Sequence, residues 1–241
     1  ATGTAEASPE MRAAGVREVI AAADRVGVTA FGSFSTGVES VAIATSTGIR
    51  AAESRTSARL LAVTMGPDDG TGYGEAAAVD ATRIDAASVG REAAEKARRS
   101  ARPIDLAPGE YPVVLEEHAV VDLLDNLGFV GFSGLAVEEG RSFFEPGKRV
   151  ASELVTIVDD ARDPTGMPAS FDYEGVPTRR VVMLEAGVCR EIVHDAATAA
   201  RAGVASPGHG LPAPNPWGPF PLHAALAAGT TPRAALGAGL R

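Results

Sequence analysis

The clearest pattern of apolar and polar positions lies near the start of the chain and predicts a helix over residues 9–26. Ser8 before Pro9 is typical of an N-cap followed by proline at the first helical position. Gly27 is a suitable stop, because glycine readily takes the left-handed conformation that ends many helices. The apolar positions that share one helical face are Val16, Val19, Ile20 and Ala23.

Short strand-like runs follow at residues 29–34, 39–45, 49–53 and 58–65, separated by turns rich in serine, threonine and glycine. Connections this short cannot hold crossover helices, so these strands are expected to be antiparallel. A second helix is predicted over residues 86–100. The proline-containing stretch 102–109 is the best candidate for a linker.

The second part of the chain predicts a buried strand at residues 111–115 and a helix over 117–127, with Gly128 as its stop. A strand at 153–158, a hairpin over 181–192 that turns at Ala186-Gly187, a helix over 195–202 and a proline-rich loop at 206–221 follow. The predicted fold class is α+β. A smaller N-terminal domain (1–105) combines helices with an antiparallel sheet, and a larger C-terminal domain (106–241) contains a mixed sheet.

Composition narrows the possible functions of this chain of 241 residues. The net charge is −9, and the densest basic run is interrupted by glutamates, so a nucleic-acid partner is not expected. No stretch approaches the roughly 18 apolar residues of a membrane span. Cys189 is the only cysteine, which fits a reducing compartment and favours the cytoplasm.

Candidate chemical motifs are weak throughout the chain. The glycines between positions 66 and 74 follow a strand, but Glu75 stands where a dinucleotide-binding fingerprint needs its third glycine. No two of the four histidines are one helical turn apart, as a zinc peptidase motif requires. Asp172 and Glu174 precede Gly175, and these three residues are interpreted as a structural turn.

Three phrases of the sequence, in this order and spacing, resemble the TldD/PmbA metallopeptidase family. They are the phrase at residues 108–115 (PGEYPVVL), the block at 170–188 that contains SFDYEGVPT and MLEAGV, and the segment at 198–208 (TAARAGVASPG). The resemblance runs from about Pro9 to near the end of the chain. Family members usually have segments before and beyond this stretch, so the chain is expected to be a fragment lacking both ends.

The resemblance also predicts what is missing from the site. Active members of the family carry a His-Glu-x-x-x-His motif on the helix that corresponds to residues 117–127. Aligned on Leu123-Leu124, the three key positions fall on Asp125, Asn126 and Val130, which lack both histidines and the glutamate. The resemblance therefore implies a non-catalytic subunit of the TldE/PmbA type, with neither catalytic nor metal-binding residues of its own.

Such a subunit is expected to form a heterodimer with a TldD-like catalytic subunit, which would hold the zinc, and to act on unfolded or extended peptides. Four phenylalanines that follow the degenerate motif are the predicted partner interface, although filling the core is an equally good explanation of them: Phe129, Phe132, Phe143 and Phe144. Two alternatives stay open. The chain could be a divergent metallopeptidase with an atypical site that uses Asp125, His118 or Cys189, or a structural scaffold.

Overall fold

The computed structural model describes residues 1–236 and divides the chain into two compact units. The first unit consists of Ala1–Val41 and Glu53–Gly109. The second consists of Ala42–Ala52 and the chain from Glu110 onward. The predicted α+β class is confirmed, since both units combine helices with antiparallel strands. The division differs from a simple cut after residue 105, because residues 42–52 belong to the second unit.

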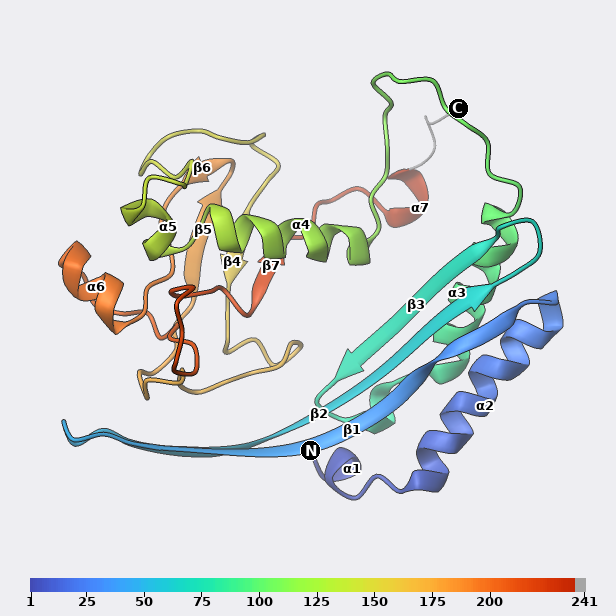
Figure 1. Ribbon diagram of the computed structural model, residues 1–241, viewed down its shortest axis with the longest axis horizontal. Helices are drawn as coiled ribbons and strands as arrows, with labels where there is room; N and C mark the ends of the chain where they lie inside the picture. Colours follow the sequence, from blue (N-terminus) through green and yellow to red (C-terminus); the bar gives the residue numbers. More distant parts are fainter. Residues whose placement is uncertain (237–241) are drawn as a thin grey trace. The chain divides into compact units, whose positions relative to one another are not determined.

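The first unit contains a three-stranded sheet in the order β1-β2-β3, with α2 and α3 packed on one face (Figure 1). Its elements are α1 (Thr2–Ala5), α2 (Pro9–Val26), β1 (Thr29–Ala44), β2 (Arg50–Met65), β3 (Thr71–Ala78), the 3₁₀ turn η1 (Ala81–Arg83) and α3 (Ala86–Ser100). The prediction of four short strands at residues 29–65 is wrong, because two long strands form the hairpin. Residues 35–38 and 54–57, where breaks were expected, lie within these strands, and the Ser54 hydroxyl bonds with that of Ser40 across the hairpin at 2.8 Å.

Both long helices of the first unit have the bounds that the sequence predicts, because side-chain caps define them. Ser8 Oγ accepts a hydrogen bond from the backbone N–H of Met11 at 3.2 Å, which satisfies one free donor of the first turn of α2. Gly27 ends this helix in the left-handed conformation, with φ of 72°. Asp85 caps α3 in the same way as Ser8 caps α2, accepting from the N–H of Ser88 at 3.0 Å.

Glycines on β3 bring the backbone of α3 directly onto the strand. A Cβ on Gly72 would lie 1.9 Å from the carbonyl oxygen of Ala93, and one on Gly74 or on Gly70, just before the strand, would lie 2.5 Å or 2.4 Å from a carbonyl oxygen of α3. The Thr64 hydroxyl uses this proximity to donate to the same Ala93 carbonyl at 2.7 Å. These glycines, which superficially suggested a nucleotide-binding loop, therefore serve helix–sheet packing.

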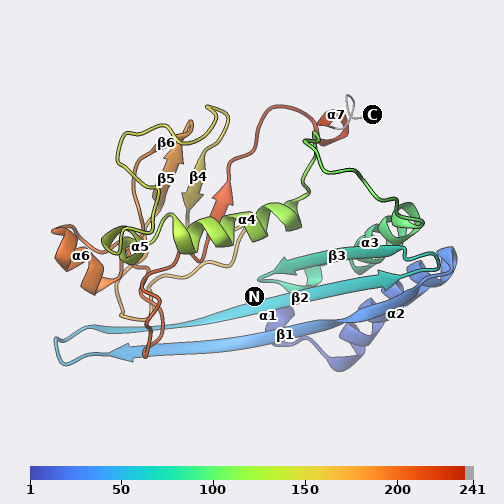
Figure 2. The same cartoon turned by 45° about the horizontal axis from the view of Figure 1, so that its top comes forward.

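The second unit is built around a four-stranded sheet in the order β6-β5-β4-β7, with α4 against it (Figure 2). Its elements are α4 (Glu117–Val130), α5 (Gly134–Glu138), β4 (Ile157–Asp159), β5 (Val181–Glu185), β6 (Val188–Cys189), α6 (Ala196–Ala202), β7 (Ala224–Leu226) and α7 (Arg233–Leu236). The named strands pair antiparallel, and Ser133 and Val193 add an isolated parallel bridge. Leu124 of α4 packs in the core with Phe132, Met183 and other apolar residues of the sheet.

Three sequence expectations fail in this unit. The strand expected at residues 153–158 is limited to β4, Ile157–Asp159. Residues 111–115 do not form a strand, and Val113 remains 67% exposed; an apolar run becomes a buried strand only where a sheet and a core receive it. Helix α4 continues past Gly128 to Val130, because that glycine lies against Pro221 and is not a helix stop. The hairpin turn is confirmed, with positive φ at Ala186 (47°) and Gly187 (76°).

The close contact of β3 with α3 predicts that Gly72→Ala destabilises the protein by about 1–3 kcal/mol, because the added methyl would collide with a backbone carbonyl that cannot easily move. Gly37→Ala in β1 is the matched control. Its Cβ would meet only Ser57 Oγ, at 3.6 Å, so stability should hardly change. Urea unfolding of both variants measures the difference. Equal midpoints would contradict this account of the packing.

Candidate functional site

A fully buried carboxylate, Asp159 at the end of β4, holds both ends of the proline-rich loop in the second unit. One oxygen, Oδ1, lies 2.8 Å from Nε2 of His209, near the start of the loop. The other, Oδ2, accepts from the backbone N–H of His223 at 2.7 Å, just after the loop. Asp159 follows the apolar residues Ile157 and Val158 in the same strand, and this position was the signal in the sequence that its side chain would be buried.

The Asp172 carboxylate organises the turn that the sequence assigned to residues 172–175. Its Oδ1 accepts from the N–H groups of Glu174 (3.0 Å) and Val176 (2.9 Å), and Oδ2 accepts from that of Gly210 (2.7 Å). Gly175 has φ of 80°, and a Cβ there would lie 2.6 Å from Cγ2 of Ile49, in the tip of the β1–β2 hairpin. Three backbone donors on one carboxylate are typical of a structural role.

Glu174 extends this arrangement to α6, where its Oε2 accepts from the backbone N–H of Ala196 at 2.7 Å. Partial burial raises the pKa of this carboxyl above its ordinary 4.5, and the nearby Asp172 and Asp195 raise it further. The hydrogen bond from Ala196 opposes the shift. The contacts of Glu174 are therefore those of a helix-terminus acceptor.

The three degenerate motif positions lie on the exposed side of α4. Val130 is 42% exposed and has no donor atom, and the Asn126 amide donates to the backbone carbonyl of Asp122 at 2.8 Å. Asp125 is exposed as well and could offer at most one carboxylate ligand. Structural and catalytic zinc sites use three or four nitrogen, sulfur or oxygen ligands from the protein. These residues do not fit a zinc ion.

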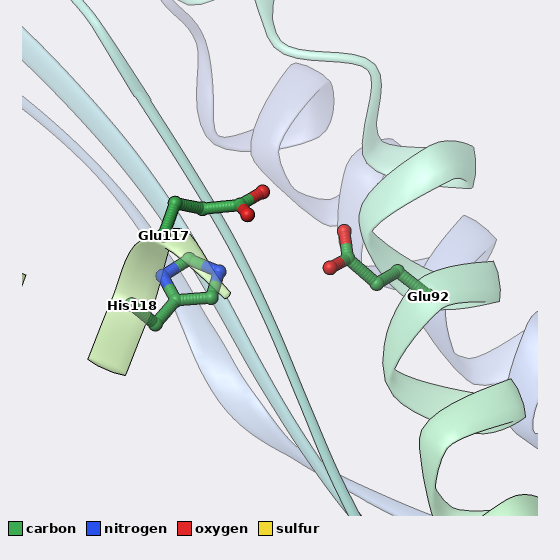
Figure 3. A group of neighbouring side chains, drawn as sticks. All are labelled: Glu92, Glu117 and His118. Atoms are coloured by element: carbon green, nitrogen blue, oxygen red, sulfur yellow. The ribbon is translucent and has the colours of Figure 1, made fainter. Parts of the chain in front are cut away.

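Glu117 and His118 are adjacent at the first turn of α4 (Figure 3). The pKa of Glu117 is lowered, first by its own backbone N–H and also by Arg233, whose Nη1 donates to it at 3.0 Å. Glu92, also drawn in Figure 3, lies on α3 in the first unit. Within either unit, among residues 1–236, no three His, Cys, Asp or Glu side chains bring their ligand atoms within 4.8 Å of one another.

The four phenylalanines of the predicted interface separate into two pairs. Phe132 and Phe144 are 0% and 9% exposed and belong to the core, so the interface prediction is wrong for them. Phe129 and Phe143 remain partly exposed. Trp217, 62% exposed, lies beside Phe129 with ring centroids 5.7 Å apart.

Cys189 is buried at 0% exposure, which removes it as an accessible nucleophile for a divergent enzyme.

Two buried polar atoms have no hydrogen-bond partner in the described part of the chain: Ser133 Oγ and His209 Nδ1. His194 is also buried, at 8% exposure, next to α6. Its burial could not be predicted, because spacing along the chain does not show which histidines face the interior. Across residues 1–236, none of the helices combines the length and apolar character needed to cross a bilayer.

The chain matches two family models over nearly its whole length. Residues 4–101 match the PmbA/TldA metallopeptidase central domain, and residues 108–239 match the PmbA/TldA metallopeptidase C-terminal domain. The chain therefore belongs to the PmbA/TldD metallopeptidase family, as its sequence predicts.

Relatives with curated names agree with this assignment. A metalloprotease TldD homolog from Buchnera aphidicola is 36% identical over 106 residues, which are 42% of this chain and 22% of the relative. A metalloprotease from Methanocaldococcus jannaschii is 30% identical over 122 residues, which are 49% of this chain and 27% of the relative. The matched stretch is thus about a quarter of the length of these relatives.

Solved structures share the fold. A candidate modulator of a DNA gyrase from Thermotoga maritima has a TM-score of 0.82 and 24% identity, covering 93% of this chain and 53% of its own. TldE from Thermococcus kodakarensis has a TM-score of 0.74 and 21% identity, with the same coverage of both chains. The chain spans about half the length of these structures.

The raised pKa of Glu174 predicts the effect of Glu174→Gln. A carboxyl with a raised folded pKa favours folding below its unfolded pKa and loses this contribution as pH rises through the folded pKa. The neutral amide keeps an acceptor for Ala196. The melting temperature at pH 7 should therefore be unchanged or slightly higher, with any gain absent near about pH 4.

Glu174→Ala is the contrasting variant, because it removes the acceptor and should cost about 1 kcal/mol. Thermal unfolding at both pH values compares the three proteins. A large loss of stability in Glu174→Gln alone would show that the negative charge itself is needed.

Proposed function

We propose that this chain is a non-catalytic, TldE/PmbA-type part of a two-subunit metallopeptidase and that a TldD-like partner supplies the zinc and the chemistry. This proposal rests on the lack of metal ligands at the motif positions of α4. By the resemblance of the sequence, α4 corresponds to the motif helix of active members, yet Val130 has no ligand atom and the Asn126 amide bonds to its own helix. The fold shared with the TldE of T. kodakarensis supports the same assignment.

The proposed role of the subunit is to complete the peptide-binding cleft for unfolded or extended peptides. Backbone hydrogen bonds at sheet edges bind extended chains with little demand on sequence. In the first unit, β1 and β3 are the edges of the sheet. We also propose that the protein is cytoplasmic, and the buried, unbridged Cys189 is consistent with that location.

An exposed aromatic patch is the proposed contact with the partner. It consists of Phe129 and Trp217, and the Arg141 guanidinium lies 5.9 Å from the centroid of the Phe129 ring. Phe143, which is also exposed, packs edge-on against the core residue Phe132 with ring centroids 5.6 Å apart. Aromatic residues and arginine are enriched at the energetic centres of protein interfaces. The patch replaces the original set of four phenylalanines, of which two fill the core.

Because the motif positions of α4 lack zinc ligands, we expect the purified chain to hold no stoichiometric zinc, with less than about 0.1 zinc ion per chain after dialysis. Elemental analysis measures it, and the TldD-like subunit from the same host serves as the positive control. About one zinc per chain, surviving dialysis, would refute the non-catalytic assignment and favour a divergent enzyme.

The aromatic patch predicts that Trp217→Ala weakens association with the TldD-like subunit by about 2 kcal/mol while the melting temperature of the free chain hardly changes. Phe132→Ala is the matched control. Its side chain is fully buried, so it should lower the free energy of unfolding by about 3–5 kcal/mol.

Affinity measured by calorimetry and melting measured on the same samples separate the two effects. Unchanged affinity in Trp217→Ala would exclude the patch as the contact. Failure of the wild-type chain to pair with the TldD-like subunit at all would instead favour a structural scaffold.

A further inference from the structure

A cavity of about 400 Å³ lies in the second unit beside α5 and α6, away from the degenerate motif positions of α4. Its lining residues are Gly134, Val137, Glu138, Ile192, His194, Arg201 and Ala202. Most of this lining is apolar, and His194 contributes a ring that is only 8% exposed. A largely apolar cavity with a few convergent polar groups is the usual form of a small-ligand site.

The hydrogen bonds around His194 determine which ring nitrogen carries the hydrogen. The Thr198 hydroxyl donates its single hydrogen to Asp195 Oδ1 at 2.8 Å, because an ionised carboxylate can only accept. Thr198 Oγ1 is also 3.1 Å from His194 Nδ1, so it accepts from an Nδ1–H group. Nε2 therefore has the lone pair, and no donor in residues 1–236 reaches it.

Gly134 is needed for this position of the ring. A Cβ on Gly134 would lie 2.5 Å from His194 Nδ1 and 3.1 Å from Thr198 Oγ1, so any larger residue would displace the imidazole. The ring is thus held from one side by Gly134 and Thr198. Nε2 is therefore the ring atom that can accept a hydrogen bond from a ligand in the cavity.

Burial favours the neutral form of His194 and lowers its pKa below the ordinary 6.5. Asp195 and Glu138 oppose this shift, and Arg179 and His209 add to it with smaller effects. On the cavity wall, Arg201 Nε lies 3.0 Å from each carboxylate oxygen of Glu138. This ion pair cancels the wall charges and holds the planar guanidinium in place, where an aromatic ring can stack on it.

We propose that this cavity binds a neutral aromatic group with a hydrogen-bond donor, a phenol or an indole. The O–H or N–H group donates to Nε2 of His194, and the ring packs against Val137, Ile192 and the Arg201 guanidinium. A charged ligand would lack a counter-charge, since Arg201 and Glu138 neutralise each other. The group can be a free small molecule or the side chain of a tyrosine or tryptophan in a peptide.

The test titrates the full chain with p-cresol and indole, and with toluene and naphthalene as matched probes without a donor, while NMR follows side-chain signals. We expect p-cresol to bind about tenfold more tightly than toluene, the contribution of one hydrogen bond. The shifts should fall on Val137, Ile192 and the His194 ring. The first unit has a separate apolar groove, lined by residues such as Val16, Ile20 and Phe31. Equal affinities, no saturable binding, or shifts confined to that groove would overturn the proposal.

His194→Phe should abolish the preference for p-cresol over toluene, whereas His223→Gln, a change at another histidine of the same unit, should retain it. If His194→Phe does not fold, the wild-type chain provides the same test. Acidification that protonates Nε2, followed by the His194 ring signals in the same NMR spectra, should weaken p-cresol binding more than toluene binding. A preference independent of both pH and His194 would refute the role of the imidazole.

The source of the ligand is tested with a capped pentapeptide that has tyrosine at its centre. Binding about tenfold tighter than p-cresol would assign the cavity to a peptide side chain. Equal or weaker binding would assign it to a free phenol or indole. These titrations use the chain without a partner, so their outcome is independent of the two-subunit proposal.

Discussion

The second unit depends on the burial of one carboxylate. Asp159 is fully buried and accepts hydrogen bonds from both sides of the proline-rich loop, through the His209 ring and the His223 backbone. Asp172 adds a third attachment at Gly210. Prolines donate no backbone hydrogen bonds, so a loop rich in them cannot be held by a regular ladder and needs acceptors such as these. A buried carboxylate is tolerated when its oxygens are hydrogen-bonded, which explains how an otherwise apolar strand can carry Asp159.

The sequence predicts the elements whose ends are defined by local chemistry. The cap at Ser8, the left-handed Gly27 and the Ala186-Gly187 turn all involve residues within a few positions of one another, and each is where the sequence places it. The family was predictable for a different reason, since several phrases in fixed order identify it. The α+β class follows from these elements together.

Features that depend on distant neighbours could not be read from the sequence. Phe132 and Phe143 are indistinguishable by type, and only the packing shows that one is buried while the other meets solvent. The glycines of β3 looked like a nucleotide loop because their helical neighbour was not known. Of the candidate site, the turn at Asp172 was predictable from its residue types. The attachment of Asp159 to His209 and the bonding of His194 to Thr198 were not, because each needs the tertiary fold.

The tip of the long hairpin has a consequence for how the chain is made. Residues 42–52 belong to the second unit, where Ile43 and Ile49 cover Gly175, yet they are synthesised long before that turn. During synthesis the first unit can assemble its sheet and both helices while the tip of its own hairpin stays without its apolar cover. The second unit is therefore not one continuous stretch of chain, and its apolar cover over Gly175 comes from residues that precede this turn by more than a hundred positions.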